Sequence, residues 1–391
     1  MNRLNQLNKA TVISLIVVLI ICLGPPQNAP AQGCPSHCNG GSTALGVEAL
    51  NENTGAVNTA IGYLALSLYT TGDFNTATGD TALLLNTTGG YNTATGATAL
   101  YRNTTGSNNT ATGGFALFDN TTGSFNTANG AHALESNVGS NNTAIGASAL
   151  LKNTTGNFNM ASGFEALFSN TTGNYNMASG FQALRQNTTG ELNTANGGNA
   201  LEKNTTGNSN TANGAGALSK NTTGVDNTAT GGAALYFNTT GFTNTANGVG
   251  ALVNNTTGSG NVALGFLAGK NATTGSGNVY IGAEILGVAG ENNACYIASI
   301  FGQTSANGIP VLINSSNKLG TATSSARFKR NIHDMDKASE ALFALRPVAF
   351  RYKEEIDPAG ISQFGLVAED VEKINRDLVV RDKEGKPYSV R

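Results

Sequence analysis

The sequence predicts a mainly β protein: a repetitive parallel β-solenoid or β-roll shaft of 17-residue coils, followed by a small α+β domain. Three observations predict this. The motif Asn-Thr-Ala-x-Gly recurs through residues 58–282. The composition includes 50 Gly, no Trp and only 12% charged residues. Residues 326–391, by contrast, hold 13 of the 22 Lys and Arg and 12 of the 24 Asp and Glu. A periodic, nearly uncharged region next to one of ordinary charge indicates a repeat array joined to a globular domain.

The repeat has a spacing of 17 residues with one step of 16, between Asn126 and Asn142, where Asn137-Val138-Gly139 replaces Asn-Thr-Thr-Gly. Ser42 to Gly46 is a degenerate first copy. The full unit reads N-T-A-x-G-x-x-A-L-x-x-N-T-T-G-x-x. Its leading Asn residues are Asn58, Asn75, Asn92, Asn109, Asn126, Asn142, Asn159, Asn176, Asn193, Asn210, Asn227, Asn244, Asn261 and Asn278.

Each unit is predicted to be one coil with two short strands and two turns. Thr-Ala-x alternates as a strand does, and Ala-Leu supplies a second apolar pair. Gly and Asn-Thr-Thr-Gly provide the turns and exclude a helix. Stacked coils place each Asn above the Asn of the previous coil, so the side-chain amides are expected to form a ladder along the axis. Fourteen coils give a shaft of about 65 Å.

The apolar content of one coil is small: two Ala, one Leu and an occasional aromatic residue. Burial of so small an apolar area contributes little free energy compared with the conformational entropy that is lost when seventeen residues are ordered. We therefore expect a homotrimer in which three chains share the Leu stripe. Asn261-Val-Ala-Leu-Gly and Asn278-Val-Tyr-Ile-Gly resemble the head repeats of trimeric autotransporter adhesins, a resemblance that implies a trimeric parallel β-roll. The period here is longer than theirs.

The N-terminus has the features of an export signal. Arg3 and Lys9 precede a short apolar run, and Ala29-Pro30-Ala31 is an A-x-A cleavage site. Residues 1–31 are thus predicted to be a signal peptide, which places the mature protein outside the cell or at its surface. An uncleaved N-terminal anchor is the alternative.

The cysteines and the low net charge give no indication of a metal, a cofactor or a nucleic-acid ligand. Cys34 and Cys38 are close enough for a small disulfide after export, and Cys295 is left odd, either buried or paired between chains. Two Cys with His37 are too few for zinc, so no metal and no cofactor are predicted. A net charge of −2 gives no basic patch for nucleic acid. The shaft offers no carboxylate pair for glycan cleavage, and a glycan or host-surface ligand is not located.

Residues 32–57 form an N-terminal segment with the first repeat, and residues 283–323 a neck with a strand at 310–314. In 324–391 we expect a helix over 336–345 with Asp336 as N-cap, a strand over 348–352, another over 364–367 and a helix over 368–375. Segments 378–381 and 388–390 are expected to pair around Glu384-Gly385.

Three segments of this domain resemble the peptidase S74 family, the intramolecular chaperone of phage endosialidase tail spikes, also found in the myelin regulatory factor. They are Ser324-Ser-Ala-Arg-Phe-Lys329-Arg-Asn-Ile332, Leu345-Arg-Pro-Val-Ala-Phe-Arg-Tyr-Lys353 and Gly365-Leu-Val-Ala-Glu-Asp-Val-Glu372. The resemblance implies a domain that trimerises, drives folding of the upstream fibre and then cuts itself off. The family continues into long helices, whereas this sequence stops at Arg391, so slower or absent cleavage is expected.

In that family a Ser and a Lys five residues later carry the cleavage, positions that Ser324 and Lys329 occupy here. A Ser hydroxyl needs a base, and Lys is one only when neutral, which burial or a nearby cation such as Arg327 or Arg330 favours. The Thr323–Ser324 bond is the expected cut, with the bond after Ser324 as the alternative. The sequence therefore predicts an exported, self-cleaving trimeric fibre. The alternative is a non-catalytic surface adhesin or stalk with a trimerisation cap.

Overall fold

The computed structural model describes residues 40–68, 70–300, 311–314, 316–321, 325–332, 336–355, 360–382 and 384–390. The chain divides into two compact units, Met1–Gly302 and Gln303–Arg391, and each is described here by itself. The predicted signal peptide, its A-x-A site and the Cys34–Cys38 pair lie outside the described residues.

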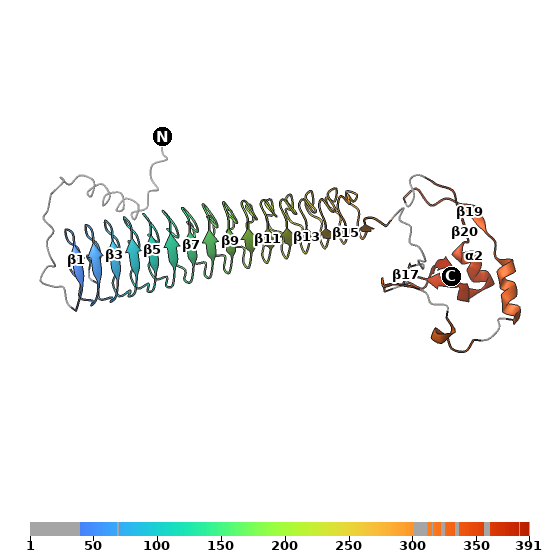
Figure 1. Cartoon of the computed structure of the whole chain (residues 1–391), viewed down its shortest axis with the longest axis horizontal. Helices are drawn as coiled ribbons and strands as arrows, with labels where there is room; N and C mark the ends of the chain where they lie inside the picture. Colours follow the sequence, from blue (N-terminus) through green and yellow to red (C-terminus); the bar gives the residue numbers. More distant parts are fainter. Residues whose placement is uncertain are drawn as a thin grey trace, which may run out of the picture. The chain divides into compact units, whose positions relative to one another are not determined.

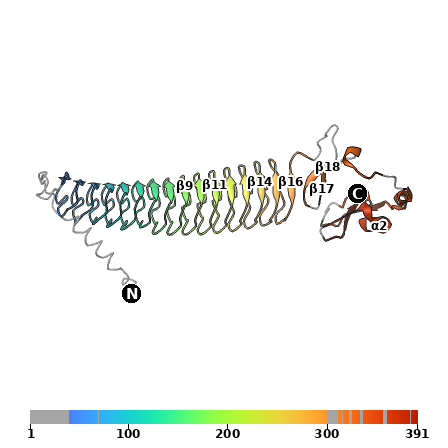
Figure 2. The ribbon, with the colours of Figure 1, turned by 90° about the horizontal axis from the view of Figure 1, so that it is seen from below.

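The first unit is a parallel β-solenoid in which sixteen three-residue strands follow one another in chain order, as the sequence predicts (Figure 1). Figure 2 shows the same row of coils from a second direction. The strands are β1 (Thr43–Leu45), β2 (Thr59–Ile61), β3 (Thr76–Thr78), β4 (Thr93–Thr95), β5 (Thr110–Thr112), β6 (Thr127–Asn129), β7 (Thr143–Ile145), β8 (Met160–Ser162), β9 (Met177–Ser179), β10 (Thr194–Asn196), β11 (Thr211–Asn213), β12 (Thr228–Thr230), β13 (Thr245–Asn247), β14 (Val262–Leu264), β15 (Val279–Ile281) and β16 (Cys295–Ile297).

Every strand is a Thr-Ala-x segment or its variant, and each pairs in register with the same segment of the next coil, as Thr110 does with Thr127. The Gly after each strand is required by its backbone: Gly113 has a φ of 128°, and a Cβ there would lie 2.7 Å from the Gly130 carbonyl. β1 confirms the degenerate first copy. β16 continues the sheet past Gly282, where the sequence period fades.

The predicted second strand of each coil is wrong. Ala116 and Leu117 are both fully buried, whereas neighbouring residues of a strand point to opposite faces. The chain achieves this with left-handed residues, Phe115 at φ 61° and Leu117 at φ 51°, on either side of Ala116. This turn still bonds to the adjacent coil, since the Leu100 N–H donates to the Ala116 carbonyl at 2.9 Å.

Two ladders of buried Asn run along the interior and confirm the predicted amide ladder. In the first, the side-chain oxygen of each leading Asn accepts the backbone N–H of the next one, as Asn92 accepts from Asn109 at 3.0 Å. In the second, the Asn of each Asn-Thr-Thr-Gly turn bonds to its counterpart, as Asn103 donates to Asn86 at 2.7 Å. The ladders satisfy the polar groups that the narrow interior encloses.

The Leu stripe is not available for sharing between chains. The repeat Leu side chains from Leu66 to Leu252 are fully buried inside a single chain, packed with the two Ala of each coil. The expectation that three chains share this stripe is therefore wrong: each coil closes its own core.

The second unit contains small antiparallel pairs and short helices. Strands β17 (Val311–Ile313) and β18 (Leu319–Thr321) pair, as do β19 (Val348–Phe350) with β20 (Gln363–Gly365) and β21 (Val379–Arg381) with β22 (Pro387–Val390). The helices among its described residues are η1 (Ala326–Phe328), η2 (Asp336–Ala344), α2 (Ala368–Ile374) and η3 (Arg376–Leu378), and of these four α2 alone is an α-helix. In the part of the chain that the structure describes, no helix is long and apolar enough to cross a membrane.

Candidate functional site

The predicted catalytic pair lies at the start of the first C-terminal motif. Lys329 is exposed and follows the 3-10 turn η1, where its backbone N–H donates to the Ala326 carbonyl at 3.0 Å. Beside it the Arg327 guanidinium lies 4.7 Å from the Phe328 ring centroid. Ser324 lies outside the described residues, so the geometry of the Ser324–Lys329 pair stays a prediction.

The second and third motifs are brought together by the fold. Strand β19 of the second motif pairs with β20, so that Val348 lies opposite Gly365 of the third motif. An ion pair adds to this contact, because the Arg346 guanidinium lies 3.2 Å from the Asp370 carboxylate at the start of α2.

The carboxylates of α2 are held ionised by these neighbours. Hydrogen bonds from Lys373, at 3.0 Å, and from Arg346 lower the pKa of Asp370 below its ordinary value. A hydrogen bond from Arg381 lowers the pKa of Glu372 in the same way and ties α2 to β21. These carboxylates are therefore ionised near neutral pH, where they hold α2 to its neighbours and do not serve as proton donors.

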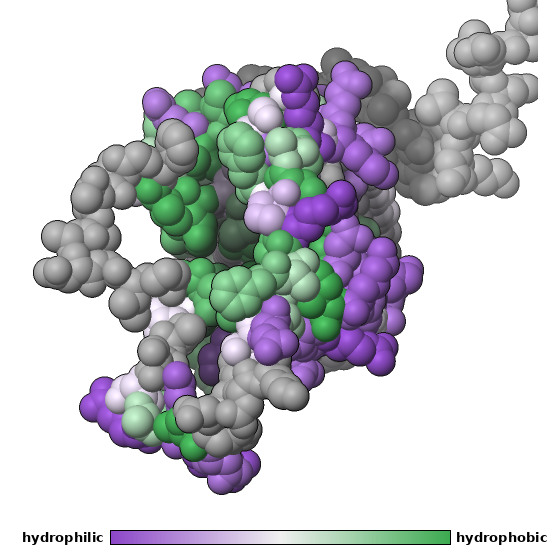
Figure 3. Space-filling view, turned by 90° about the vertical axis from the view of Figure 1, so that its right-hand side faces the viewer, coloured by the Kyte–Doolittle hydropathy of each residue, from purple (hydrophilic) through white to green (hydrophobic). Residues whose placement is uncertain are grey.

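The second unit has very little core of its own. Among its described residues, only Val371 and Val379 are buried hydrophobic residues. Large apolar side chains are exposed instead, including Phe343 at 91%, Phe364 at 86% and Tyr388 at 75%. Figure 3, in which this unit faces the viewer, shows hydrophobic residues across its surface. Large apolar side chains that gather on an exposed surface are typical of an interaction site.

The comparison with known families identifies the segment that carries these motifs. Residues 324–380 match the peptidase S74 family model, described as chaperone of endosialidase. All three motifs found in the sequence fall inside this endosialidase-chaperone segment, together with Ser324 and Lys329. No curated protein and no solved structure matches the chain.

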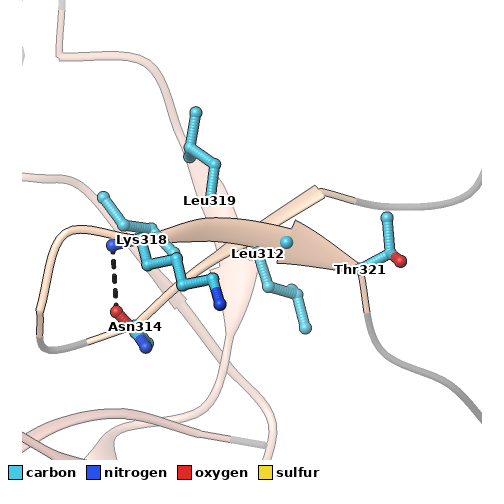
Figure 4. A pocket seen from close by; sticks show the side chains of 7 residues that line it. Leu312, Asn314, Lys318, Leu319 and Thr321 are labelled. Atoms are coloured by element: carbon cyan, nitrogen blue, oxygen red, sulfur yellow. Dashed lines mark hydrogen bonds between the residues drawn. The ribbon is translucent and has the colours of Figure 1, made fainter.

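A shallow pocket lies just before the endosialidase-chaperone segment, over the β17–β18 hairpin (Figure 4). Leu312, Leu319 and Thr321 line it, and the Lys318 backbone N–H donates to the Asn314 side-chain oxygen at 2.9 Å across the turn. The hairpin alone forms this pocket, and its walls are exposed. Its lining supplies a single ionisable group, Lys318, so it does not provide an acid–base pair.

Sequence reasoning did not find the Arg346–Asp370 pair. Both residues lie inside the motifs that were recognised, but a separation of 24 residues gives no local pattern. Of the two alternatives for Cys295, burial is wrong, since its side chain is exposed on β16, and pairing between chains stays a prediction. An outward position beside the inward Tyr296 follows from the strand alternation, which is a signal that the sequence does contain.

Proposed function

We propose that the chain is an exported, homotrimeric, fibre-like surface protein whose C-terminal unit directs trimeric folding of the solenoid and then cuts itself off. The match of residues 324–380 to the endosialidase-chaperone family carries this proposal. The exposed Phe343, Phe364 and Tyr388 support it, because they are the surface that association of three copies would cover.

In the proposed cleavage, the Ser324 hydroxyl attacks the carbonyl carbon of Thr323 while neutral Lys329 accepts the hydroxyl proton. An ester forms on Ser324 as the Thr323–Ser324 amide bond breaks and its nitrogen gains a proton. Water then hydrolyses the ester and releases the two chains. Lys329 is exposed in one chain, so the mechanism requires that assembly bury its side chain and thereby favour the neutral amine.

Cleavage is tested by denaturing electrophoresis of the full chain extended at its C-terminus with the long helices of the family. This parent gives two bands, whereas Ser324→Ala and Lys329→Ala each give one. The neighbouring Ser325→Ala is the matched control and still gives two. A Ser324→Ala chain that is cut as well as the parent overturns the assignment of the nucleophile.

The exposure of Lys329 also favours the second candidate, a non-catalytic stalk whose C-terminal unit is a trimerisation cap. A parent chain that sediments as a trimer but stays uncut supports the cap. A parent chain that sediments as a monomer contradicts both candidates. For export, N-terminal sequencing of secreted protein is expected to begin at Gln32, and a sequence that begins at Met1 indicates an anchor.

A further inference from the structure

The outward face of the sixteen-stranded sheet carries no charge. We call this the sheet face, defined by the first and third residues of strands β1–β16, which flank the inward residue of each strand. Its first residues are mostly Thr, with Met160, Met177, Val262, Val279 and Cys295 as the exceptions. Its third residues are Thr, Asn, Ser, Leu or Ile. Solvent-exposed surfaces usually carry Lys and Glu, so a face without charge along the whole sheet differs from an ordinary protein surface.

Exposed apolar side chains gather on and beside this face. The rows that flank the strands add Phe158, Tyr175 and Leu192 before the leading Asn residues, and Phe164 and Phe181 after the Gly residues. All five are about half exposed or more, between 47% and 58%. Together with Met160 and Met177 they make a continuous aromatic and Met-rich patch over neighbouring coils. The two flanking rows, which are the residue before each leading Asn and the residue after the Gly of each strand, include only two charged residues, Asp80 and Asp226.

Most charges of the shaft lie instead on the turn that follows Ala-Leu: they are Glu52, Arg102, Asp119, Glu135, Lys152, Arg185, Glu202, Lys203, Lys220 and Lys270. The remaining charged residues of 40–300 are Glu48, Asp73, Asp80, Glu165, Glu191, Asp226, Glu284 and Glu291, and none of them is a strand residue. Lys203 and Lys220 occupy the same position in successive coils, so the solenoid tolerates like charges stacked along its axis. Stacking within one chain therefore does not account for the uncharged sheet face.

Symmetric association does account for it. When identical parallel chains surround one axis, each residue near the axis lies at the same height as its own copies, so any charge there faces a like charge. Interface cores are correspondingly depleted in charged residues and enriched in aromatic residues and Met. We propose that the sheet face is the surface through which three identical shafts pack together. This inference rests on the proposed homotrimer and assigns its shaft interface.

The face is large enough for this role. Sixteen strands at about 4.8 Å give a length of about 75 Å, and five extended residues at about 3.3 Å give a width of about 16 Å. The product is about 1,200 Å² per chain, which a trimer divides between two neighbours, so each pairwise contact receives about 600 Å² per partner, at the lower end of the range for stable interfaces.

The arrangement of the aromatic rings favours another copy over a glycan. Phe158 and Tyr175 stack on each other with 5.0 Å between ring centroids and 1° between ring planes, and Phe74 and Tyr91 stack at 4.9 Å. One face of each of these rings is therefore covered by its neighbour, which reduces the open aromatic face left for an outside partner. Sugar rings and bases need an open aromatic face, whereas ring edges pack against side chains at protein interfaces.

The test is disulfide cross-linking of the full chain, with its native cysteines replaced by Ser. Thr127→Cys places a thiol on the sheet face in β6, and Lys152→Cys places one on the charged turn of the next coil. Under mild oxidation, Thr127→Cys is expected to give disulfide-linked dimers on a non-reducing gel, because copies of this residue meet near the axis. Lys152→Cys is the matched control and is expected to stay monomeric on that gel. Sedimentation of both variants before oxidation checks that they assemble.

The outcomes separate this inference from the proposed function. Trimers that cross-link through Thr127→Cys and not through Lys152→Cys support it. Trimers that cross-link only through Lys152→Cys, or through neither, overturn it and leave the homotrimer standing. A parent chain that sediments as a monomer overturns both.

Discussion

At the residue scale, the repeat Leu shows how burial outweighs backbone strain. Leu117 has a φ of 51°, a left-handed conformation that costs an L-residue roughly 1–2 kcal/mol. Its side chain is fully buried, which contributes about 1.5–3 kcal/mol. Gly would remove the strain but would also leave the interior of the coil empty. The coil therefore accepts a strained Leu at nearly every turn.

The second Asn ladder ends at a single substitution. Ala272 lies where the repeat has Asn, and the Asn255 side-chain oxygen has no hydrogen-bond partner. We expect Ala272→Asn to supply the missing amide donor and to stabilise the shaft by about 1 kcal/mol, the usual net value of one hydrogen bond. The measurement is the urea midpoint of the loss of β circular dichroism.

The control for this prediction lies in the middle of the same ladder. Asn187 donates to Asn170 and accepts from Asn204, both at 2.8 Å. Asn187→Ala removes the donor to the buried Asn170 side-chain oxygen, whereas the Asn204 amide keeps its bond to the Gly207 carbonyl at 2.9 Å, so the expected cost is about 1–3 kcal/mol for one unsatisfied group. An Ala272→Asn midpoint at or below that of the parent would show that the site cannot hold the amide.

At the element scale, two neighbouring coils near the end of the solenoid depart from the repeat in complementary ways: one has a smaller core side chain and the next has a larger one. Gly269 replaces the repeat Leu, and Tyr280 replaces the repeat Ala in the next coil. A Cβ on Gly269 would lie 2.7 Å from the Tyr280 ring, which is fully buried. The ring therefore fills the volume that the missing Leu leaves.

This exchange predicts a coupled pair of substitutions. Tyr280→Ala leaves a cavity and is expected to cost about 3–5 kcal/mol, while Gly269→Leu alone overpacks the coil at about 1–3 kcal/mol. The double variant restores the Leu and Ala of the repeat, so its cost is expected to be smaller than the sum. A double-mutant cycle of thermal or denaturant midpoints measures the coupling. Additive costs would contradict the exchange.

The ion pairs of α2 predict an acid-sensitive contact. Lys373 and Arg346 lower the pKa of Asp370 from its ordinary 3.8, so their contribution is complete above that value and is lost as the pH falls through the lowered pKa. We expect the protection factors of the α2 amides, which correct the exchange rate for its intrinsic dependence on pH, to fall on acidification in the parent and to change less in Asp370→Asn. Glu369→Gln is the control, because its carboxylate forms no ion pair among the described residues. Equal acid responses in the parent and Asp370→Asn would exclude the contact as the cause.

The sequence predicts the strands and ladders because their determinants are local and repeat: Thr-Ala-x alternates, and Asn recurs at one register. It does not predict the path of Ala-Leu, since nothing in Leu117 itself signals a left-handed backbone. The closed core follows from that path, which is why the predicted sharing of Leu between chains was wrong. In the candidate site, the motifs were predictable, whereas the Arg346–Asp370 pair needed the fold. The Ser324–Lys329 pair stays a prediction.

At the scale of the whole molecule, the solenoid is one-dimensional: each coil bonds to the coil before it and the coil after it. Deletion of the complete coil 193–209 is therefore expected to bring Asn176 next to Asn210 and to keep the fold. The shaft should shorten by about 4.8 Å, and its β circular dichroism per residue should be unchanged. Small-angle scattering measures the length.

Deletion of residues 193–200 is the control for the coil deletion. It removes half a coil and places turn residues beside strand residues, so the ladders cannot continue. The one-dimensional description would be wrong if both deletions lowered the thermal midpoint equally.

The 16-residue coil shows that the solenoid also tolerates the loss of a single residue from a turn. One residue is missing at Val138-Gly139, yet Asn137 still donates to Asn120 at 3.3 Å and Thr127 still pairs with Thr143. In an ordinary strand a slip of one residue turns every later side chain to the wrong face. Here each coil starts again from its leading Asn, so the slip stays within one turn. A gene for such a shaft tolerates the loss of single codons in its turns, and duplication or loss of whole coils resets the length of the fibre without redesign of its remaining parts.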